Sequence, residues 1–282
     1  MMRDQFKGVF TALVTPFLGG EVDHTSVNRL VERQIRDGVN GFVIHGTTGE
    51  SPTTSVEEKR KVFETVKEIC PKGMPLIVGT GSNSTAETIK MSLLAQEWGA
   101  DAALVVVPYY NKPPQRGLIE HFSTIADKVK IPVILYNVPS RTVTSLEVET
   151  IKTLSQHPNI IGIKEATGNI EMAKKIRQSC AKEFLLLSGD DGTYEEFCKA
   201  GGDGVISVTS HVFPAAMLSR KTADFKRLTE LLFSESNPIP VKAALHLMQV
   251  IRSPELRLPL VKMSEEKMIP LKEELKKHGF LK

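Results

Sequence analysis

The chain has 282 residues, 36 basic and 33 acidic side chains, and a hydrophobic content of 41%. This composition is enough for a sizeable core, and the balanced charge without a long basic block argues against a nucleic-acid-binding protein. Three widely spaced cysteines argue against a disulfide framework or a zinc site. No apolar run approaches the ~18 residues of a membrane span, and no signal-peptide pattern is visible, so we expect a cytoplasmic protein without membrane contacts.

Short apolar segments alternate with helical segments along the chain. Eight of the apolar segments are near-continuous and rich in β-branched residues, which is typical of buried parallel strands. They are residues 9–17, 41–47, 75–81, 102–110, 132–139, 160–167, 183–191 and 203–210. Between them, apolar residues recur on one helical face, as in Val27, Leu30, Val31 and Ile35. Thr25, Ser84 and Ser145 are predicted N-caps of three such helices.

Alternating strands and helices allow two architectures, a doubly wound sheet and a (β/α)8 barrel. About eight strand–helix units match the barrel. A dinucleotide-binding sheet would carry G-x-G-x-x-G after its first strand, whereas "GTGSNS" follows the third strand and no P-loop is present. We therefore predict an α/β fold, a (β/α)8 TIM barrel over residues 1–222. The rest of the chain, 223–282, is predicted to be a helical segment packed on the barrel.

A lysine ends one of the predicted strands, in "IIGIKEATG" (160–168). Active sites of such barrels lie at the C-terminal ends of the strands. Side-chain alternation places Ile160 and Gly162 on the face of Lys164, whereas Ile161, Ile163 and Glu165 face the helices. An amine among apolar residues is poorly solvated, which favours the neutral form that attacks a ketone to give an imine. The alternative is a structural lysine that reaches the barrel mouth or pairs with Glu165.

Hydroxyl groups also gather at the predicted strand ends. Three of the four tyrosines lie there, Tyr109, Tyr110 and Tyr136, and Thr47 and Thr48 follow the second strand. Linked hydroxyls can move the protons that imine chemistry requires, and the threonine amides can hold a carboxylate. One of Tyr109 and Tyr110 is a wall residue on this interpretation, because neighbours on a strand face opposite ways.

Other polar residues near the strand ends have simpler interpretations. Arg141 follows the fifth strand and can bind a carboxylate through two parallel N–H groups of its guanidinium, or it can form a surface ion pair. His45 has no neighbours at metal-ligand spacing and is interpreted as structural. Asp190 and Asp191 lack a third ligand in sequence reach, so we expect a turn or helix cap and no metal site.

Four motifs, "GTTGES", "PYYNKP", "YNVPSRT" and "GIKEATG", together resemble the dihydrodipicolinate synthase family, also called 4-hydroxy-tetrahydrodipicolinate synthases. The resemblance runs from "GVFTALVTPF" to "LRLPL" and so covers nearly the whole chain. "GTTGE" with the lysine marks the wider superfamily of pyruvate-dependent Schiff-base aldolases. "YNVPSRT", which contains Arg141, indicates the synthase branch.

The resemblance implies a covalent mechanism with no separate cofactor. Lys164 would form an imine with pyruvate, and Tyr136 would pass protons between the imine and the enamine. Thr47 and Tyr110 would complete a hydroxyl relay, with Tyr110 reaching in from a neighbouring subunit. The expected assembly is a homotetramer built as a dimer of dimers, although the residues alone do not separate tetramer from dimer.

The same resemblance assigns substrate-binding residues. Thr48 would hold the pyruvate carboxylate, and Arg141 would bind the carboxylate of L-aspartate 4-semialdehyde. Gly189 and Ile206 would supply backbone groups near the lysine. The product would enter the diaminopimelate pathway of lysine biosynthesis.

This chain departs from the family at positions that bear on regulation. Val143 stands where the family often has glycine, which bears on the entrance to the site. A possible allosteric lysine site matches the family at Ser51, Asn83, Glu87 and Tyr109. Val56 and Lys59 replace histidines that are common in strongly regulated members. Because the Lys59 cation would repel a lysine ligand, we expect weak or absent lysine inhibition.

Two other functions are compatible with parts of this pattern. An aldolase that cleaves N-acetylneuraminate or a 2-keto-3-deoxy sugar acid would keep Lys164 and Tyr136, but Arg141 argues against it. A barrel that has lost catalysis and binds a small molecule is the remote alternative, and the presence of both Lys164 and Tyr136 argues against that.

Overall fold

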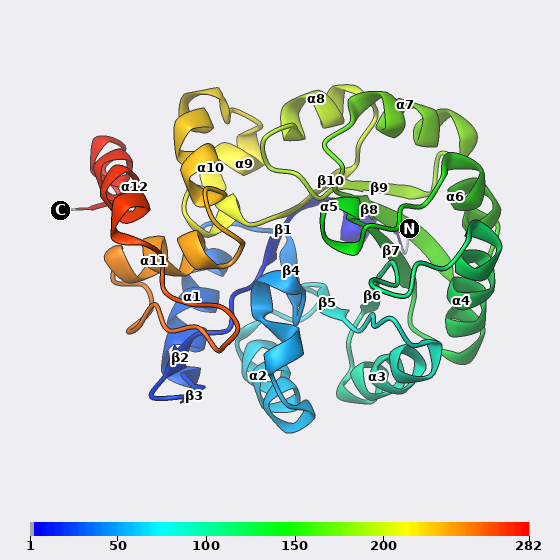
Figure 1. The fold of residues 1–282 in the computed structure, drawn as a ribbon, viewed down its shortest axis with the longest axis horizontal. Coiled ribbons are helices and arrows are strands. Elements are labelled where there is room, and N and C mark those ends of the chain that lie inside the picture. Colours follow the sequence, from blue (N-terminus) through cyan, green and yellow to red (C-terminus); the bar gives the residue numbers. More distant parts are fainter. Residues whose placement is uncertain (1–2, 282) are drawn as a thin grey trace. The chain divides into compact units, whose positions relative to one another are not determined.

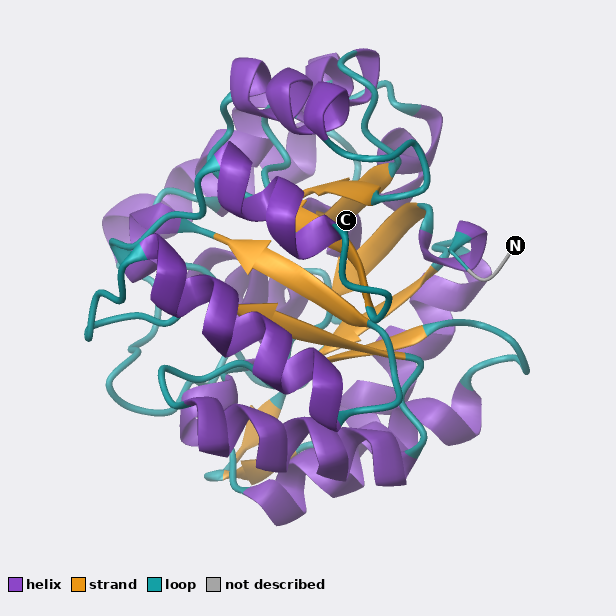
Figure 2. Cartoon of the chain, turned by 90° about the vertical axis from the view of Figure 1, so that its right-hand side faces the viewer, coloured by secondary structure: helices purple, strands orange, loops and turns teal. Residues whose placement is uncertain are grey.

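The computed structural model describes residues 3–281, and the strands of its main sheet form a closed barrel (Figure 1). The order around the barrel is β1-β10-β9-β8-β7-β6-β5-β4. The bounds are β1 (Gly8–Ala12), β4 (Gly41–Ile44), β5 (Leu76–Gly79), β6 (Ala102–Val106), β7 (Val133–Asn137), β8 (Ile160–Glu165), β9 (Leu185–Ser188) and β10 (Gly204–Ser207). Each predicted segment overlaps one of these strands, with β1 starting one residue before its segment, and helices lie between the strands in sequence. Figure 2 distinguishes the strands (orange) from the helices (purple). The predicted (β/α)8 fold is therefore confirmed.

The chain divides into two compact units. The first holds the described residues up to 10 together with 75–207, and the second holds 11–74 together with 208–281. The helices of the first unit are α3 (Thr85–Trp98), α4 (Gln115–Lys128), α5 (Pro139–Thr142), α6 (Val148–Ser155), α7 (Ile170–Ser179) and α8 (Tyr194–Lys199), after a short 3-10 turn, η1 (Asp4–Phe6).

The core of the first unit lies between its strands and its helices. Helix α6 packs between α4 and α7 (Figure 1). Apolar side chains from β6 to β9 meet apolar side chains from these three helices, and burial of this surface is the main favourable term in folding. The core includes Val105, Leu135, Ile163, Leu186, Phe122, Ile151 and Ile176.

Strand β8 carries an irregularity opposite β7. Val133 pairs with Ile160, but the next residue, Ile134, pairs with Gly162. Ile161 is therefore an extra residue on β8, as in a β-bulge. An extra residue shifts the in–out alternation of the strand by one position, so side chains before and after it no longer follow one period of two.

This bulge overturns one prediction for β8. Ile160 lies in the helix-facing core together with Ile163, so the expected placement of Ile160 on the face of Lys164 is wrong, whereas that of Ile163 is confirmed.

The close approach of β8 and β9 explains why position 162 is a glycine. A Cβ atom there would lie 2.5 Å from the Cβ of Leu185 on β9. The two strands approach so closely that only glycine fits.

The second unit contains a hairpin that the sequence analysis did not predict. β2 (Phe17–Leu18) pairs antiparallel with β3 (Glu21–Val22). The two residues between them, Gly19 and Gly20, have φ of 63° and 86°, which suits the tight turns of two-residue hairpin loops.

The helices of the second unit come from both ends of the chain. They are α1 (His24–Arg36), α2 (Val56–Ile69), α9 (Pro214–Ser219), α10 (Lys226–Leu232), α11 (Ile239–Leu247) and α12 (Glu265–Lys277). Four 3-10 turns join them: η2 (Thr47–Gly49), η3 (Ser51–Thr53), η4 (Thr209–His211) and η5 (Ala223–Phe225). Residues 223–281 thus have the helical content expected of them, and the boundary at residue 222 stays a prediction. Within residues 3–281, no helix combines the length and hydropathy needed to cross a membrane.

Helix starts were predicted with mixed success. Ser84 is the N-cap of α3, as predicted, and its hydroxyl accepts a backbone N–H of the first turn. Helix α1 is capped by Asp23 rather than Thr25, because it starts earlier and the carboxylate reaches its first turn. Helix α6 begins later than expected, with Glu147 as its N-cap in place of Ser145.

Candidate active site

The amine of Lys164 lies against the ring of Tyr136. The two residues are paired in register near the ends of β8 and β7. The Lys164 Nζ atom is 4.2 Å from the centroid of the Tyr136 ring. Each residue is only 7% exposed, so Lys164 does not extend into solvent. The alternative of a lysine that reaches the barrel mouth does not fit this burial.

Glu165 is occupied by other partners. Its carboxylate accepts hydrogen bonds from Asn137 Nδ2 at 2.8 Å and from the Thr167 backbone N–H at 2.7 Å. Burial raises the pKa of Glu165, and these hydrogen bonds partly oppose the rise. The carboxylate therefore ties the end of β8 to the end of β7, and the alternative in which Glu165 pairs with Lys164 does not fit these contacts.

Gly189 lies against the side chain of Lys164. A Cβ atom at Gly189 would be 2.8 Å from Lys164 Cε and 2.5 Å from the Cβ of Ala166. The Gly189 backbone N–H donates to the Glu165 carbonyl at 2.7 Å, which fixes this approach. Ile206, on β10, is 2% exposed, and the residue before it pairs with Ser188, the residue before Gly189.

The first of the two aspartates after β9 acts as a turn residue. Asp190 Oδ1 accepts hydrogen bonds from the backbone N–H and the hydroxyl of Thr193, at 2.9 and 2.8 Å. The expected turn is therefore confirmed at Asp190, while Asp191 is buried beside it. In the part of the chain that the structure describes, no group of three or more His, Cys, Asp or Glu side chains could hold a metal ion.

The tyrosines after β6 lie in an exposed loop. Tyr110 is 90% exposed and Tyr109 is 40% exposed. Tyr110 has a φ of 73°, which is unusual for a bulky residue. Asn111 donates from its side chain to the Asn83 carbonyl at 2.8 Å, so this loop lies beside Asn83. Glu87 follows in the exposed first turn of α3.

Arg141 is carried by α5, directly after β7. Its backbone N–H donates to the Val138 carbonyl at 2.9 Å, and its side chain is exposed. Val143 follows with a φ of 63° and is 69% exposed. A β-branched residue in this region is a backbone outlier, and the glycine that the resemblance leads us to expect here would fit this backbone with less strain.

The second unit carries the paired threonines on residues 46–55, which we call the threonine loop. Thr47 is half-buried and Thr48 is 4% exposed. The Thr48 hydroxyl accepts a hydrogen bond from Asn237 Nδ2 at 2.8 Å. Ser51, assigned to the possible lysine site, lies on the same loop in η3.

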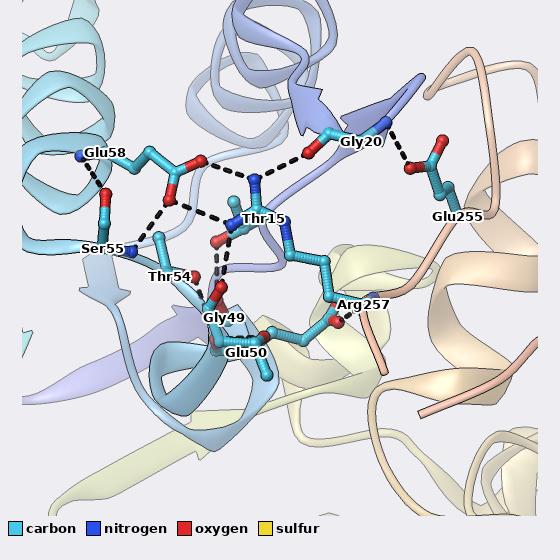
Figure 3. Close-up of polar contacts among 10 residues, drawn as sticks. Thr15, Gly20, Gly49, Glu50, Thr54, Ser55, Glu58, Glu255 and Arg257 are labelled. Carbon is cyan, nitrogen blue, oxygen red and sulfur yellow. Dashed lines mark hydrogen bonds and ion pairs between the residues drawn. The ribbon is translucent and has the colours of Figure 1, made fainter. Parts of the chain in front are cut away.

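A charged cluster that includes Glu50 of the threonine loop was not predicted from the sequence. Glu50 and Lys242 form an ion pair with both side chains buried. Figure 3 shows the second pair of the cluster, between Arg257 and Glu58. Burial lowers the pKa of Lys242, and the Glu50 carboxylate opposes this. Hydrogen bonding to Arg257 lowers the pKa of Glu58 to about 2.

His45 has a structural environment, in line with its interpretation. It is 2% exposed, and its Nε2 lies 2.8 Å from the carbonyl of Lys59. Burial lowers the pKa of His45 to about 3. The ring is therefore neutral near pH 7, and its Nε2–H donates to that carbonyl.

Comparison with known proteins extends over nearly the whole chain. The model of the dihydrodipicolinate synthetase family matches residues 5–278. The 4-hydroxy-tetrahydrodipicolinate synthase of Bdellovibrio bacteriovorus is 54% identical, covering 98% of this chain and 99% of that protein.

Solved structures agree with this match. Dihydrodipicolinate synthase from Thermotoga maritima superposes with a TM-score of 0.95 at 41% identity, over 98% of this chain and 99% of that one. The chloride-inhibited enzyme from Acinetobacter baumannii, solved in complex with pyruvate, gives a TM-score of 0.94 at 43% identity with the same coverage. The chain therefore belongs to the dihydrodipicolinate synthetase family.

Proposed function

We propose that the chain is a 4-hydroxy-tetrahydrodipicolinate synthase that condenses pyruvate with L-aspartate 4-semialdehyde. The observation that carries the proposal is the buried Lys164 amine held against the Tyr136 ring at the ends of two adjacent strands. The relatives named above support it, because they carry this activity in their names and match nearly the full chain.

The reaction begins with covalent capture of pyruvate. The Lys164 amine attacks the keto carbon, and loss of water gives an imine. Loss of a proton from the pyruvate methyl group gives an enamine, whose carbon attacks the aldehyde of the second substrate. The amino group of that substrate then attacks the imine carbon, which closes the ring and releases Lys164. No separate cofactor is required.

Other side chains move protons and orient the substrates in this proposal. The Tyr136 hydroxyl, on the ring that contacts Lys164, passes protons during imine and enamine formation, together with Thr47 and Tyr110. Thr48 holds the pyruvate carboxylate, and Arg141 binds the carboxylate of the semialdehyde. The approach of Gly189 to Lys164 leaves backbone groups near the new imine, as does Ile206.

The proposed relay includes a residue from a second subunit. Tyr110 is 90% exposed on its own chain, so its phenol is accessible to a neighbouring subunit. We infer a homotetramer, built as a dimer of dimers, in which Tyr110 enters the site of a neighbouring subunit.

Borohydride trapping tests the proposal. Protein incubated with pyruvate and then reduced should gain the mass of one reduced pyruvate on Lys164, located by peptide mapping. The Lys164→Ala variant should stay folded, gain no adduct at that peptide, and lose several orders of magnitude in turnover. Folded wild-type protein that gains no adduct would overturn the proposal.

A second stage separates the substrates. Wild-type protein should consume pyruvate with aspartate semialdehyde and should leave N-acetylneuraminate uncleaved. Cleavage of N-acetylneuraminate with no turnover of the semialdehyde would instead identify a sugar-acid aldolase.

A further inference from the structure

The threonine loop contains a strained turn. Glu50 joins the two 3-10 turns η2 and η3 and has φ 53° and ψ 41°. A non-glycine residue in this left-handed region persists only where its surroundings hold it, and such residues cluster at functional sites. The Glu50 carbonyl accepts hydrogen bonds from the Thr53 N–H at 3.1 Å and the Thr54 hydroxyl at 2.9 Å. These contacts are local, so the position of the whole turn has to be set from outside the loop.

Lys242, from the C-terminal part of the chain, supplies one such restraint. Its Nζ lies 2.6 Å from Glu50 Oε1 and 2.9 Å from the Thr15 carbonyl, and the exposures of the two charged side chains are 0% and 1%. The Thr15 hydroxyl in turn donates to the Gly49 carbonyl at 2.7 Å. A fully buried ion pair is weak evidence for stability, and its better attested use is to specify geometry.

Arg257 holds the far end of the loop (Figure 3). Its backbone N–H donates to Glu50 Oε2 at 3.1 Å, and its guanidinium donates to the Thr53 carbonyl at 2.8 Å and to both carboxylate oxygens of Glu58. Glu58 also accepts the Ser55 N–H at 2.8 Å. Both ends of the second 3-10 turn are thereby fixed.

Asn237 acts on a threonine directly. Its side-chain N–H donates to the Thr48 hydroxyl oxygen at 2.8 Å, and both residues are buried, at 8% and 4% exposed. A hydroxyl has one donor and two acceptor sites. Because Asn237 occupies an acceptor site of Thr48, the hydroxyl proton remains available to a carboxylate.

We propose that Asn237 and Lys242 are positioning residues for pyruvate: Lys242 fixes the threonine loop through Glu50, and Asn237 orients the Thr48 hydroxyl as a donor to the pyruvate carboxylate. The proposal rests on the proposed function, in which Thr48 binds that carboxylate. Neither residue touches the reacting atoms, so each acts through the threonine loop.

The test compares how pyruvate and semialdehyde saturate three variants. Lys242→Met keeps the length of the side chain but loses the ion pair, and Asn237→Ala loses the hydrogen bond to Thr48. Arg252→Met is the matched control. Arg252 pairs with buried Asp23, with Nε–Oδ2 at 2.8 Å, and so joins the same two parts of the chain without contacting the threonine loop.

Two readouts are measured for each folded variant: the pyruvate concentration that half-saturates borohydride trapping on Lys164, and the KM of each substrate. We expect Lys242→Met and Asn237→Ala to raise both the half-saturating pyruvate concentration in trapping and the KM for pyruvate about tenfold or more. The KM for the semialdehyde should change less than about twofold. Arg252→Met should lower the melting temperature and leave both substrates unaffected.

The outcomes separate this proposal from the proposed function. Wild-type protein that traps no pyruvate contradicts the proposed function itself. Wild-type trapping with unchanged pyruvate saturation in folded Lys242→Met and Asn237→Ala overturns the positioning role. Equal losses for both substrates, or the same loss in Arg252→Met, also overturn it, because they indicate a purely structural effect. If Lys242→Met does not fold, the Asn237→Ala values decide.

Discussion

Lys164 Nζ lies 4.2 Å from the centroid of the Tyr136 ring, and the two residues are paired in register on β8 and β7. Backbone pairing therefore sets the distance between the amine and the phenol ring. The following pair in the same register, Asn137 and Glu165, is joined by a side-chain hydrogen bond of 2.8 Å. The site is thus built on strands, which position groups more precisely than loops do.

The Tyr136→Phe variant isolates the role of the hydroxyl. Phenylalanine keeps the ring beside Lys164, so we expect the fold and the position of the amine to be preserved. Loss of the proton-transfer group should lower kcat by about 10²–10⁴-fold. Steady-state kinetics and a thermal melt would check this. A kcat within a few fold of wild type would remove Tyr136 from the proton relay.

The Gly189→Ala variant tests the close approach to the lysine. The new methyl group would lie 2.8 Å from Lys164 Cε and 2.5 Å from the Cβ of Ala166, so the lysine side chain and the chain at Ala166 have to shift. A misplacement on the order of 1 Å can cost about 10²-fold in activity, and we expect a loss of about 10- to 100-fold in kcat/KM for pyruvate with the fold retained.

Gly192→Ala is the control for this change. A Cβ atom at Gly192 would have its nearest contact at 3.4 Å, with Asp190 Oδ1, so this variant should keep near wild-type activity. Equal activity of Gly189→Ala and Gly192→Ala would show that activity does not depend on the absence of a side chain beside Lys164.

The barrel and its lysine were predictable because they leave local signals. Each strand is a short apolar run, and Lys164 ends one of them. The bulge at Ile161 was not predictable, because an extra apolar residue in an apolar run leaves the pattern unchanged. The cap at Asp23 was not predicted because Thr25, two positions later, also belongs to the residue types that favour the N-cap.

Contacts between residues far apart in the chain leave no pattern in the sequence from which they could be predicted. Glu50 and Lys242 are 192 residues apart, and neither stands out from the other charged residues of the chain. The left-handed conformation of Val143 was likewise hidden, because valine gives no indication of a positive φ. Its position became suggestive only through the resemblance, where glycine is common.

Arg141→Ala tests the second substrate. Because Arg141 is assigned to the carboxylate of aspartate semialdehyde, we expect the KM for this substrate to rise about tenfold or more. Pyruvate trapping on Lys164 should be unchanged, since it precedes binding of the semialdehyde. Unchanged semialdehyde kinetics would refute the assignment.

Lysine inhibition is expected to be weak or absent. The resemblance to the family implies that Val56, 45% exposed at the start of α2, and Lys59 stand at positions of the regulatory site where histidine is expected in strongly regulated members. A cation at position 59 would repel the ammonium of a lysine ligand. Activity measured against rising lysine decides the matter, and strong inhibition at low millimolar lysine or below would contradict the prediction.

The ion pair between Glu58 and Arg257 predicts how stability depends on pH. Hydrogen bonding to Arg257 lowers the pKa of Glu58 from 4.5 to about 2. Because the carboxyl pKa is depressed in the folded state, the stabilisation of the fold by this ion pair is fully present above pH 4.5 and is lost as the pH falls toward 2.

Glu58→Gln removes this charge while keeping an acceptor for the Ser55 N–H. The free energy of unfolding of the variant should be about 1–2 kcal/mol below that of wild type at pH 7, a value reduced for partial exposure. This difference should disappear as the pH falls from 4.5 to 2. Urea unfolding across this range measures it. Glu57→Gln, a change at the neighbouring exposed glutamate, should alter stability little at any pH. If the difference in unfolding free energy between Glu58→Gln and wild type stays constant down to pH 2, the charge of Glu58 does not contribute to stability.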